Sequence, residues 1–133
     1  MSDTVVVGFI RTPEGEAAVD AAVEEARRRR GRVVVVHSSK GGDQDAETVM
    51  ADRDALEALE GRLRGEGIEV VVRDFARGKD PAEDLVEVAE AEQAALLVIG
   101  LRRRSPVGKL LLGSNAQQIL LAAGCPVLAV KAP

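Results

Sequence analysis

Residues 4–9 read TVVVGF, and residues 32–37 read RVVVVH. Both runs are short, continuous and rich in β-branched residues, which is typical of strands buried on both faces of a parallel sheet. Between them, Thr12 and Pro13 form an N-cap and first-turn pair, and apolar residues then recur at helical spacing until Gly31. These residues therefore predict a strand, a helix and a second buried strand.

The same alternation of strands and helices continues along the chain. After a loop over residues 40–45, we expect a helix marked by Val49, Leu56, Leu59 and Leu63 and ended by Gly65 and Gly67, and then a strand over residues 68–75. The next expected helix starts at Asp80 and Pro81 and is followed by a strand over residues 96–100 and a connection over residues 101–113. The last helix is expected to start at a Ser114/Gln117 capping box and to end at Gly124, before a final strand over residues 125–131. This order predicts an α/β fold: one domain over residues 1–133, with a Rossmann-like five-stranded parallel sheet and helices on both faces.

Composition and charge exclude several classes of function. The net charge is −4 and only 2% of residues are aromatic, which argues against a nucleic acid or an anionic membrane as a partner. The single Cys cannot form an internal disulfide, and no signal peptide is recognisable, so we expect a cytoplasmic protein. With one His and one Cys, a metal cluster of these ligands is excluded.

No catalytic motif accompanies the predicted fold. The first strand is not followed by G-x-G-x-x-G, and no Walker A sequence is present. A Ser-His-Asp triad is not excluded by counting, but no G-x-S-x-G elbow occurs. We interpret His37 as a hydrogen-bonded residue at a strand end and Cys125 as a small buried hydrophobe, and we expect no enzyme activity.

A binding site is expected beyond the carboxyl ends of the strands, where ligands of such sheets bind. Residues 10–12, 37–39 and 100–114 should converge there. The last of these segments reads GLRRRSPVGKLLLGS, and residues 101–113 carry four basic side chains and no acid on an otherwise acidic chain. Strand, basic loop, Gly113, Ser114 and helix favour an anionic ligand held by backbone N–H groups and the helix dipole. The alternatives are a simple helix cap and a solvated basic loop.

Residues 4–131 resemble the universal stress protein family. That family has a nucleotide motif of Gly, two residues, Gly, nine residues, Gly and Ser/Thr, and this chain has Gly100, Arg103, Gly113 and Ser114 at the same spacing. The ending AGCPVLAV over residues 123–130 and the junction GKDPA over residues 78–82 are also similar to the family.

The resemblance implies a strand order of 3-2-1-4-5, an adenine nucleotide ligand such as ATP, and a homodimer through the last strand. The strand residues of that dimer would be Val127, Leu128, Ala129 and Val130. The expected nucleotide-binding residues are Ile10, Arg11, Thr12, Ser38, Ile99, Gly100, Arg102, Arg103, Gly113, Ser114 and Asn115.

Two positions depart from the family's pattern. Ile10 stands where nucleotide-binding members usually carry Asp, and Arg103 stands at the second motif glycine. Two hypotheses follow: a stress-response regulatory protein that binds an adenine nucleotide without efficient catalysis, or a dimeric interaction module that works without a nucleotide. A requirement for Mg²⁺ stays open, since Ile10 removes the carboxylate that would hold a metal.

Overall fold

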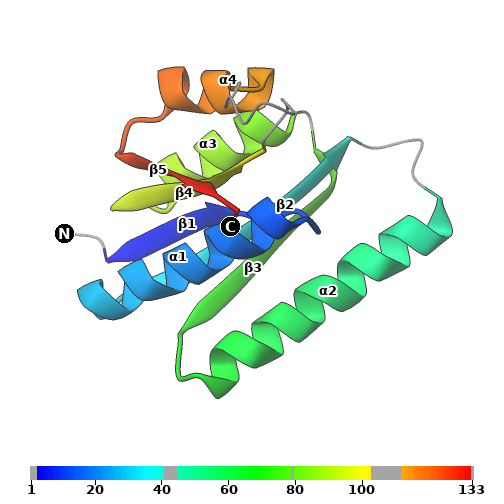
Figure 1. Cartoon of the computed structure of the whole chain (residues 1–133), viewed down its shortest axis with the longest axis horizontal. Coiled ribbons are helices and arrows are strands. Elements are labelled where there is room, and N and C mark those ends of the chain that lie inside the picture. The colour runs from blue at the N-terminus through cyan, green and yellow to red at the C-terminus, as the bar shows by residue number, and fades with distance from the viewer. Residues whose placement is uncertain (1–2, 41–44, 79, 103–111, 133) are drawn as a thin grey trace.

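The computed structural model of the chain describes residues 3–40, 45–78, 80–102 and 112–132. Strands and helices alternate throughout these residues (Figure 1). The elements are β1 (Thr4–Gly8), α1 (Pro13–Arg29), β2 (Arg32–Lys40), α2 (Ala46–Gly65), β3 (Val70–Gly78), α3 (Pro81–Ala91), β4 (Leu96–Leu101), α4 (Ser114–Ala122) and β5 (Val127–Lys131).

The five strands form one parallel sheet in the order β3-β2-β1-β4-β5, which confirms the expected fold. The strand β1 lies in the middle, so Val5 is in register with Val33 of β2 on one side and with Leu96 of β4 on the other. Strand order therefore reverses at β1, and a crevice is expected beyond its carboxyl end.

Alternate residues of the central strands pack on opposite faces of the sheet. Val5 and Val7 face the cluster formed by α1 and α2, whereas Val6 faces the cluster formed by α3 and α4. All three side chains are fully buried. Burial on both faces explains why the strands read as continuous apolar runs and not as alternating ones.

Several element boundaries differ from the sequence-based expectation by one to three residues. The strand expected over residues 68–75 runs from Val70 to Gly78. The first helix ends at Arg29, and Arg30, not Gly31, adopts the left-handed conformation with φ of 52°. Gly31 is required for packing, since a Cβ there would collide with the carbonyl oxygen of Asp3.

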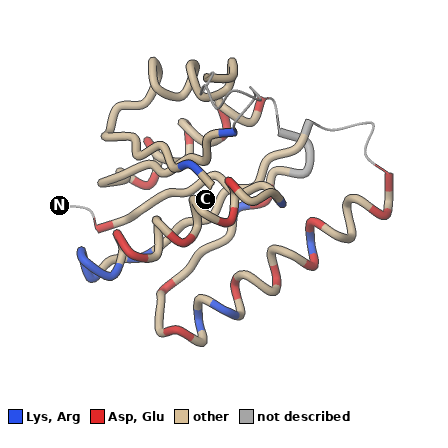
Figure 2. The backbone as a smooth tube through the Cα atoms, viewed as in Figure 1, with Lys and Arg blue, Asp and Glu red and all other residues tan. Residues whose placement is uncertain are grey.

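The last two elements of the chain, α4 and β5, carry few charges. Charged residues lie along α1, α2 and α3, but α4 has none and β5 has only Lys131 (Figure 2). As the strand order requires, β5 is an edge strand, and the side chain of Leu128 is 36% exposed. The β5 edge is therefore apolar apart from Lys131 at its end.

Candidate functional site

Two adjoining cavities lie beyond the carboxyl ends of β1, β2 and β4. One has a volume of about 150 Å³ and the other about 290 Å³. Both are lined by Ile10, Gly100, Asn115 and Ala116, so they form one cleft with two chambers. The cleft lies at the predicted crevice, where all three segments expected from the sequence contribute residues.

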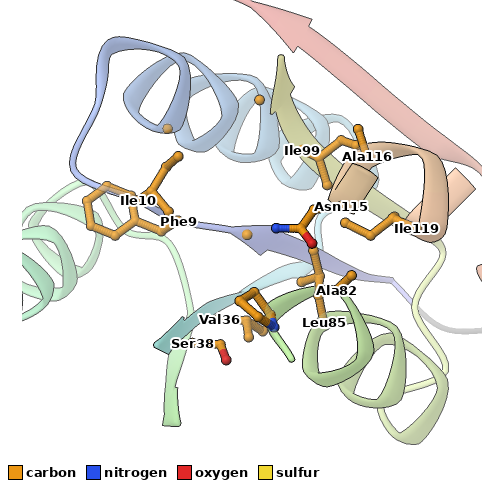
Figure 3. A pocket seen from close by; sticks show the side chains of 14 residues that line it. Phe9, Ile10, Val36, Ser38, Ala82, Leu85, Ile99, Asn115, Ala116 and Ile119 are labelled. Carbon is orange, nitrogen blue, oxygen red and sulfur yellow. The ribbon is translucent and has the colours of Figure 1, made fainter. Parts of the chain in front are cut away.

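The first chamber is mainly apolar (Figure 3). Its walls include Val36 of β2, Leu85 of α3 and Ile119 of α4, which also belong to the core cluster on this face of the sheet. Two polar side chains reach it from opposite sides: Ser38 from the end of β2 and Asn115 from the first turn of α4. The chamber can therefore enclose a flat apolar ring and still offer hydrogen bonds at two of its edges.

The second chamber is more polar than the first and lies beside the start of α4. Thr12, Glu14, Arg102 and Gly113 line it together with the shared residues. Arg102 is exposed, so its guanidinium can approach an anion from solvent. Glu14 also lines this chamber and is buried, with 8% of its surface exposed.

The N-terminus of α4 differs from those of the other helices. Thr12, Asp45 and Asp80 each cap their helix with a side-chain oxygen, whereas in the described part of the chain no side chain caps α4. The N-cap is Gly113, in an extended conformation with φ of −67° and ψ of 165°. The first N–H groups of α4 thus remain available to an anion in the second chamber.

Ser114 does not cap α4, although the sequence predicted a capping box there. It is the first residue of the helix and not its cap, it is exposed, and it lines neither chamber. The Gln117 side chain, expected in a capping box, instead donates from Nε2 to the carbonyl oxygen of Leu112 at 3.0 Å. The capping-box prediction is therefore wrong, because Gly113 takes the cap position and Gln117 binds the segment before it.

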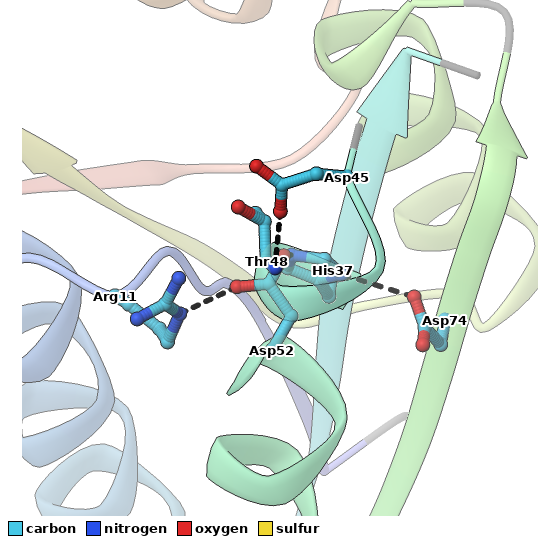
Figure 4. Close-up of polar contacts among 6 residues, drawn as sticks. All are labelled: Arg11, His37, Asp45, Thr48, Asp52 and Asp74. Carbon is cyan, nitrogen blue, oxygen red and sulfur yellow. Dashed lines mark hydrogen bonds and ion pairs between the residues drawn. The ribbon is translucent and has the colours of Figure 1, made fainter. Parts of the chain in front are cut away.

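The side chain of Arg11 contacts Asp52 on α2 and not the cleft. Its Nε lies 2.5 Å from Oδ1 of Asp52 on α2, and it lines neither chamber (Figure 4). Asp52 Oδ2 is 3.5 Å from Nε2 of His37, and Nδ1 of His37 is 3.0 Å from Oδ1 of Asp74. His37 therefore joins β2 to α2 and β3, as expected of a hydrogen-bonded strand-end residue.

Most of the predicted binding residues come together in the cleft. Those that line it are Ile10, Thr12, Ser38, Ile99, Gly100, Arg102, Gly113 and Asn115. Arg11 and Ser114 do not line it, and Arg103 lies outside the described residues.

Gly100 is required by packing at the edge of the cleft. A Cβ at this position would collide with the backbone carbonyl oxygen of Glu14 in the first turn of α1. The first glycine of the predicted motif thus lets α1 approach the end of β4, which closes one side of the cleft.

Sequence reasoning did not assign several lining residues. Ala82 and Leu85 of α3, Ala116 and Ile119 of α4, and Glu14 of α1 line the chambers. The similarity of the GKDPA junction to the family was the available signal for the start of α3. The apolar residues of α3 and α4 resemble ordinary core positions in the sequence, so their contribution required the packed structure.

Comparison with known proteins bears on the ligand of this cleft. The model of the universal stress protein family matches residues 1–131. The chain belongs to the universal stress protein family. A universal stress protein of Mycolicibacterium smegmatis is 41% identical over 127 residues, covering 96% of each chain.

Solved universal stress proteins share the fold. One from Archaeoglobus fulgidus, determined in complex with dAMP, is 32% identical with a TM-score of 0.77, and 98% of each chain is covered. Another, in complex with cAMP, is 26% identical with a TM-score of 0.72, covering 98% of this chain and 97% of the other. Nucleotide binding is thus a property found within the family.

The described residues of this universal stress protein contain no cluster of three or more His, Cys, Asp or Glu side chains arranged to hold a metal ion. No helix among them is both long enough and apolar enough to span a membrane.

Proposed function

We propose that this universal stress protein is a regulatory protein that binds an adenine nucleotide in the two-chamber cleft, without efficient catalysis. The observation that carries the proposal is the position of the uncapped α4 N-terminus directly beside the apolar chamber. A nucleotide matches this arrangement, because it joins a flat aromatic base to an anionic phosphate through a sugar.

The base would occupy the first chamber. Val36, Leu85 and Ile119 offer apolar contact to the ring, and Ser38 and Asn115 offer hydrogen bonds to its edge. Ile10 extends this apolar surface and is 49% exposed, so a ligand that covered it would remove apolar area from water.

The phosphate would occupy the second chamber. The N–H groups at the start of α4, the helix dipole and the guanidinium of Arg102 all favour negative charge there. The relatives with dAMP and cAMP support a nucleotide with one phosphate as a ligand, and the exposed guanidinium of Arg102 would pair with the further phosphates of ATP.

Binding without efficient catalysis is the role that fits the residues of the cleft. Its described lining includes neither His37 nor Cys125, the one histidine and the one cysteine of the chain. A change of nucleotide level would then be read as a change in the protein's state, which is a regulatory function.

A nucleotide-independent dimeric interaction module is the second candidate. Two observations favour it: the Ile10 side chain can neither hydrogen-bond a ribose nor coordinate a metal, and β5 presents a sheet edge whose one charged residue is Lys131. Homodimer formation through β5 is compatible with both candidates, so dimerisation alone does not decide between them.

Calorimetric titration with ATP and AMP tests nucleotide binding directly. We expect Gly113→Val to abolish binding, because its side chain would fill the approach to the α4 N-terminus. Gly124→Val is the matched control, since nothing lies within 4 Å of a Cβ at Gly124 and it lines neither chamber of the cleft. Equal affinities for wild type and Gly113→Val would move the ligand elsewhere.

Restoring the two departed motif positions tests the basis of affinity. Ile10→Asp combined with Arg103→Gly should strengthen ATP binding by roughly tenfold to a hundredfold in the presence of Mg²⁺. Wild-type binding should depend little on Mg²⁺ and should weaken with salt, since exposed arginine–phosphate contacts are screened. If wild type binds nothing and the double variant binds no better, the interaction module becomes the preferred function.

A further inference from the structure

A partly buried hydrogen bond lies beside the apolar chamber of the cleft. The Ser38 hydroxyl donates to Oδ2 of Asp84 at 2.6 Å. Asp84 lies on α3 and is only 5% exposed, whereas Ser38 lines the apolar chamber. The length is that of a charge-assisted bond between a hydroxyl and a carboxylate, which is stronger than a bond between neutral groups.

This bond decides what Ser38 can offer to a ligand. A serine hydroxyl has one hydrogen and two acceptor lone pairs. Ser38 is the donor of this bond, so its hydrogen is directed at Asp84 and lone pairs remain for the chamber. Ser38 therefore presents a hydrogen-bond acceptor to the cleft.

The position of Asp84 makes this orientation persistent. It lies in the first turn of α3, where the helix dipole favours a negative charge. Its backbone N–H already donates to the carbonyl oxygen of Asp80 at 2.9 Å, which places the residue in the helical ladder. The carboxylate is thus held by the fold and not by the ligand.

Purines differ in the group they carry at the 6-position. Adenine has an amino group, which donates hydrogen bonds, whereas guanine and hypoxanthine have a carbonyl oxygen, which accepts them. A fixed acceptor can pair with the 6-amino group of adenine. It would face another acceptor, the 6-carbonyl oxygen, in guanine and hypoxanthine, and buried polar groups would be left unpaired.

We propose that Asp84 is a positioning residue that makes Ser38 selective for purines with a 6-amino group. This inference rests on the proposed function, because it assigns the base of the nucleotide to the chamber that Ser38 lines. Ser38 would contact the base, and Asp84 would act only through the direction of the Ser38 hydroxyl.

The test compares AMP with IMP, which differ at the 6-position of the base. Titration calorimetry of wild type should give AMP an affinity roughly tenfold to a hundredfold above that of IMP. Asp84→Ala frees the hydroxyl to rotate, so IMP should gain affinity and the ratio should approach one. Ser38→Ala should also reduce the ratio, but through a loss of AMP affinity.

Glu83→Ala is the matched control, since Glu83 is an exposed acid in the same helical turn. It should leave the ratio unchanged, and a purely structural role of Asp84 would alter both affinities together without altering their ratio. If wild type binds AMP and IMP equally, or if Asp84→Ala and Ser38→Ala both keep the wild-type ratio of the two affinities, the selectivity proposal fails while nucleotide binding stands. If wild type binds neither, the proposed function fails and this inference fails with it.

Discussion

Arg11 and Asp52 form an ion pair of 2.5 Å that joins the residue after Ile10 to α2, on the side of the sheet opposite the apolar chamber. The pair directs Arg11 away from the cleft, although Arg11 is adjacent in sequence to a lining residue. Arg11 and Arg102 were both expected to bind the nucleotide, but they therefore have different surroundings.

The two arginines should respond differently to substitution. Arg102→Gln should weaken ATP binding by about threefold to tenfold, because an exposed charge-assisted contact to a phosphate is lost. Arg11→Gln should change ATP affinity less than about twofold, since its charge is paired with Asp52. Calorimetric titration of both variants at the same salt concentration measures the difference, and an equal loss in both would place Arg11 at the ligand.

Gly100→Ala should destabilise the fold. The added Cβ would collide with the carbonyl oxygen of Glu14, and such overpacking typically costs about 1–3 kcal/mol of unfolding free energy. Gly61→Ala is the control: it lies within α2 with nothing within 4 Å of a Cβ, so it should stabilise by about 0.5–1 kcal/mol. Urea unfolding of both variants gives the two values, and no loss in Gly100→Ala would contradict the packing argument.

Substitutions at two helix starts should separate a true cap from a misassigned one. Thr12→Ala should cost about 1 kcal/mol of stability, because Thr12 Oγ1 accepts a hydrogen bond from the Gly15 N–H at 3.1 Å. Ser114→Ala should change stability by less than about 0.5 kcal/mol, since Ser114 is exposed and is not the cap. A comparable loss at both sites in denaturant titrations would restore the capping role of Ser114.

Dimer formation, if it uses β5, should be sensitive to charge at Leu128. Val127 is the less suitable site for such a test because it packs against the α3/α4 core cluster, whereas Leu128 is 36% exposed. Leu128→Lys should reduce the dimer fraction measured by light scattering at micromolar concentration. Val49→Lys, on α2 and similarly exposed at 38%, should leave association unchanged. A wild-type monomer at that concentration would reject the dimer.

Cys125 should react slowly with thiol reagents near neutral pH. Burial raises the pKa of its thiol, so a smaller fraction is thiolate, the reactive form, than in the unfolded chain. The sequence predicted a small buried hydrophobe, and Cys125 is partly buried and packs against the α3/α4 core cluster. The rate of reaction with Ellman's reagent, followed against pH in the folded protein and in urea, should have its midpoint at higher pH in the folded protein.

Local sequence determined the elements of this protein and the segments that build its cleft. Runs such as residues 4–9 form buried strands because β-branched side chains suit a pleated surface covered on both faces. Thr12 and Asp80 act as the expected caps because their side chains reach backbone N–H groups two or three residues away. Strand order came only from family resemblance, since parallel strands leave no local signature of their neighbours.

Tertiary structure alone decided how side chains from distant segments face one another. Ser38 and Asp84 are 46 residues apart, and Arg11 and Asp52 are 41 apart, so no spacing rule relates them. Leu85 and Ile119 look like core residues in the sequence and become cleft walls because their helices begin at the carboxyl edge of the sheet. Side-chain direction depends on which elements pack together and in what register, and that information is distributed over the whole chain.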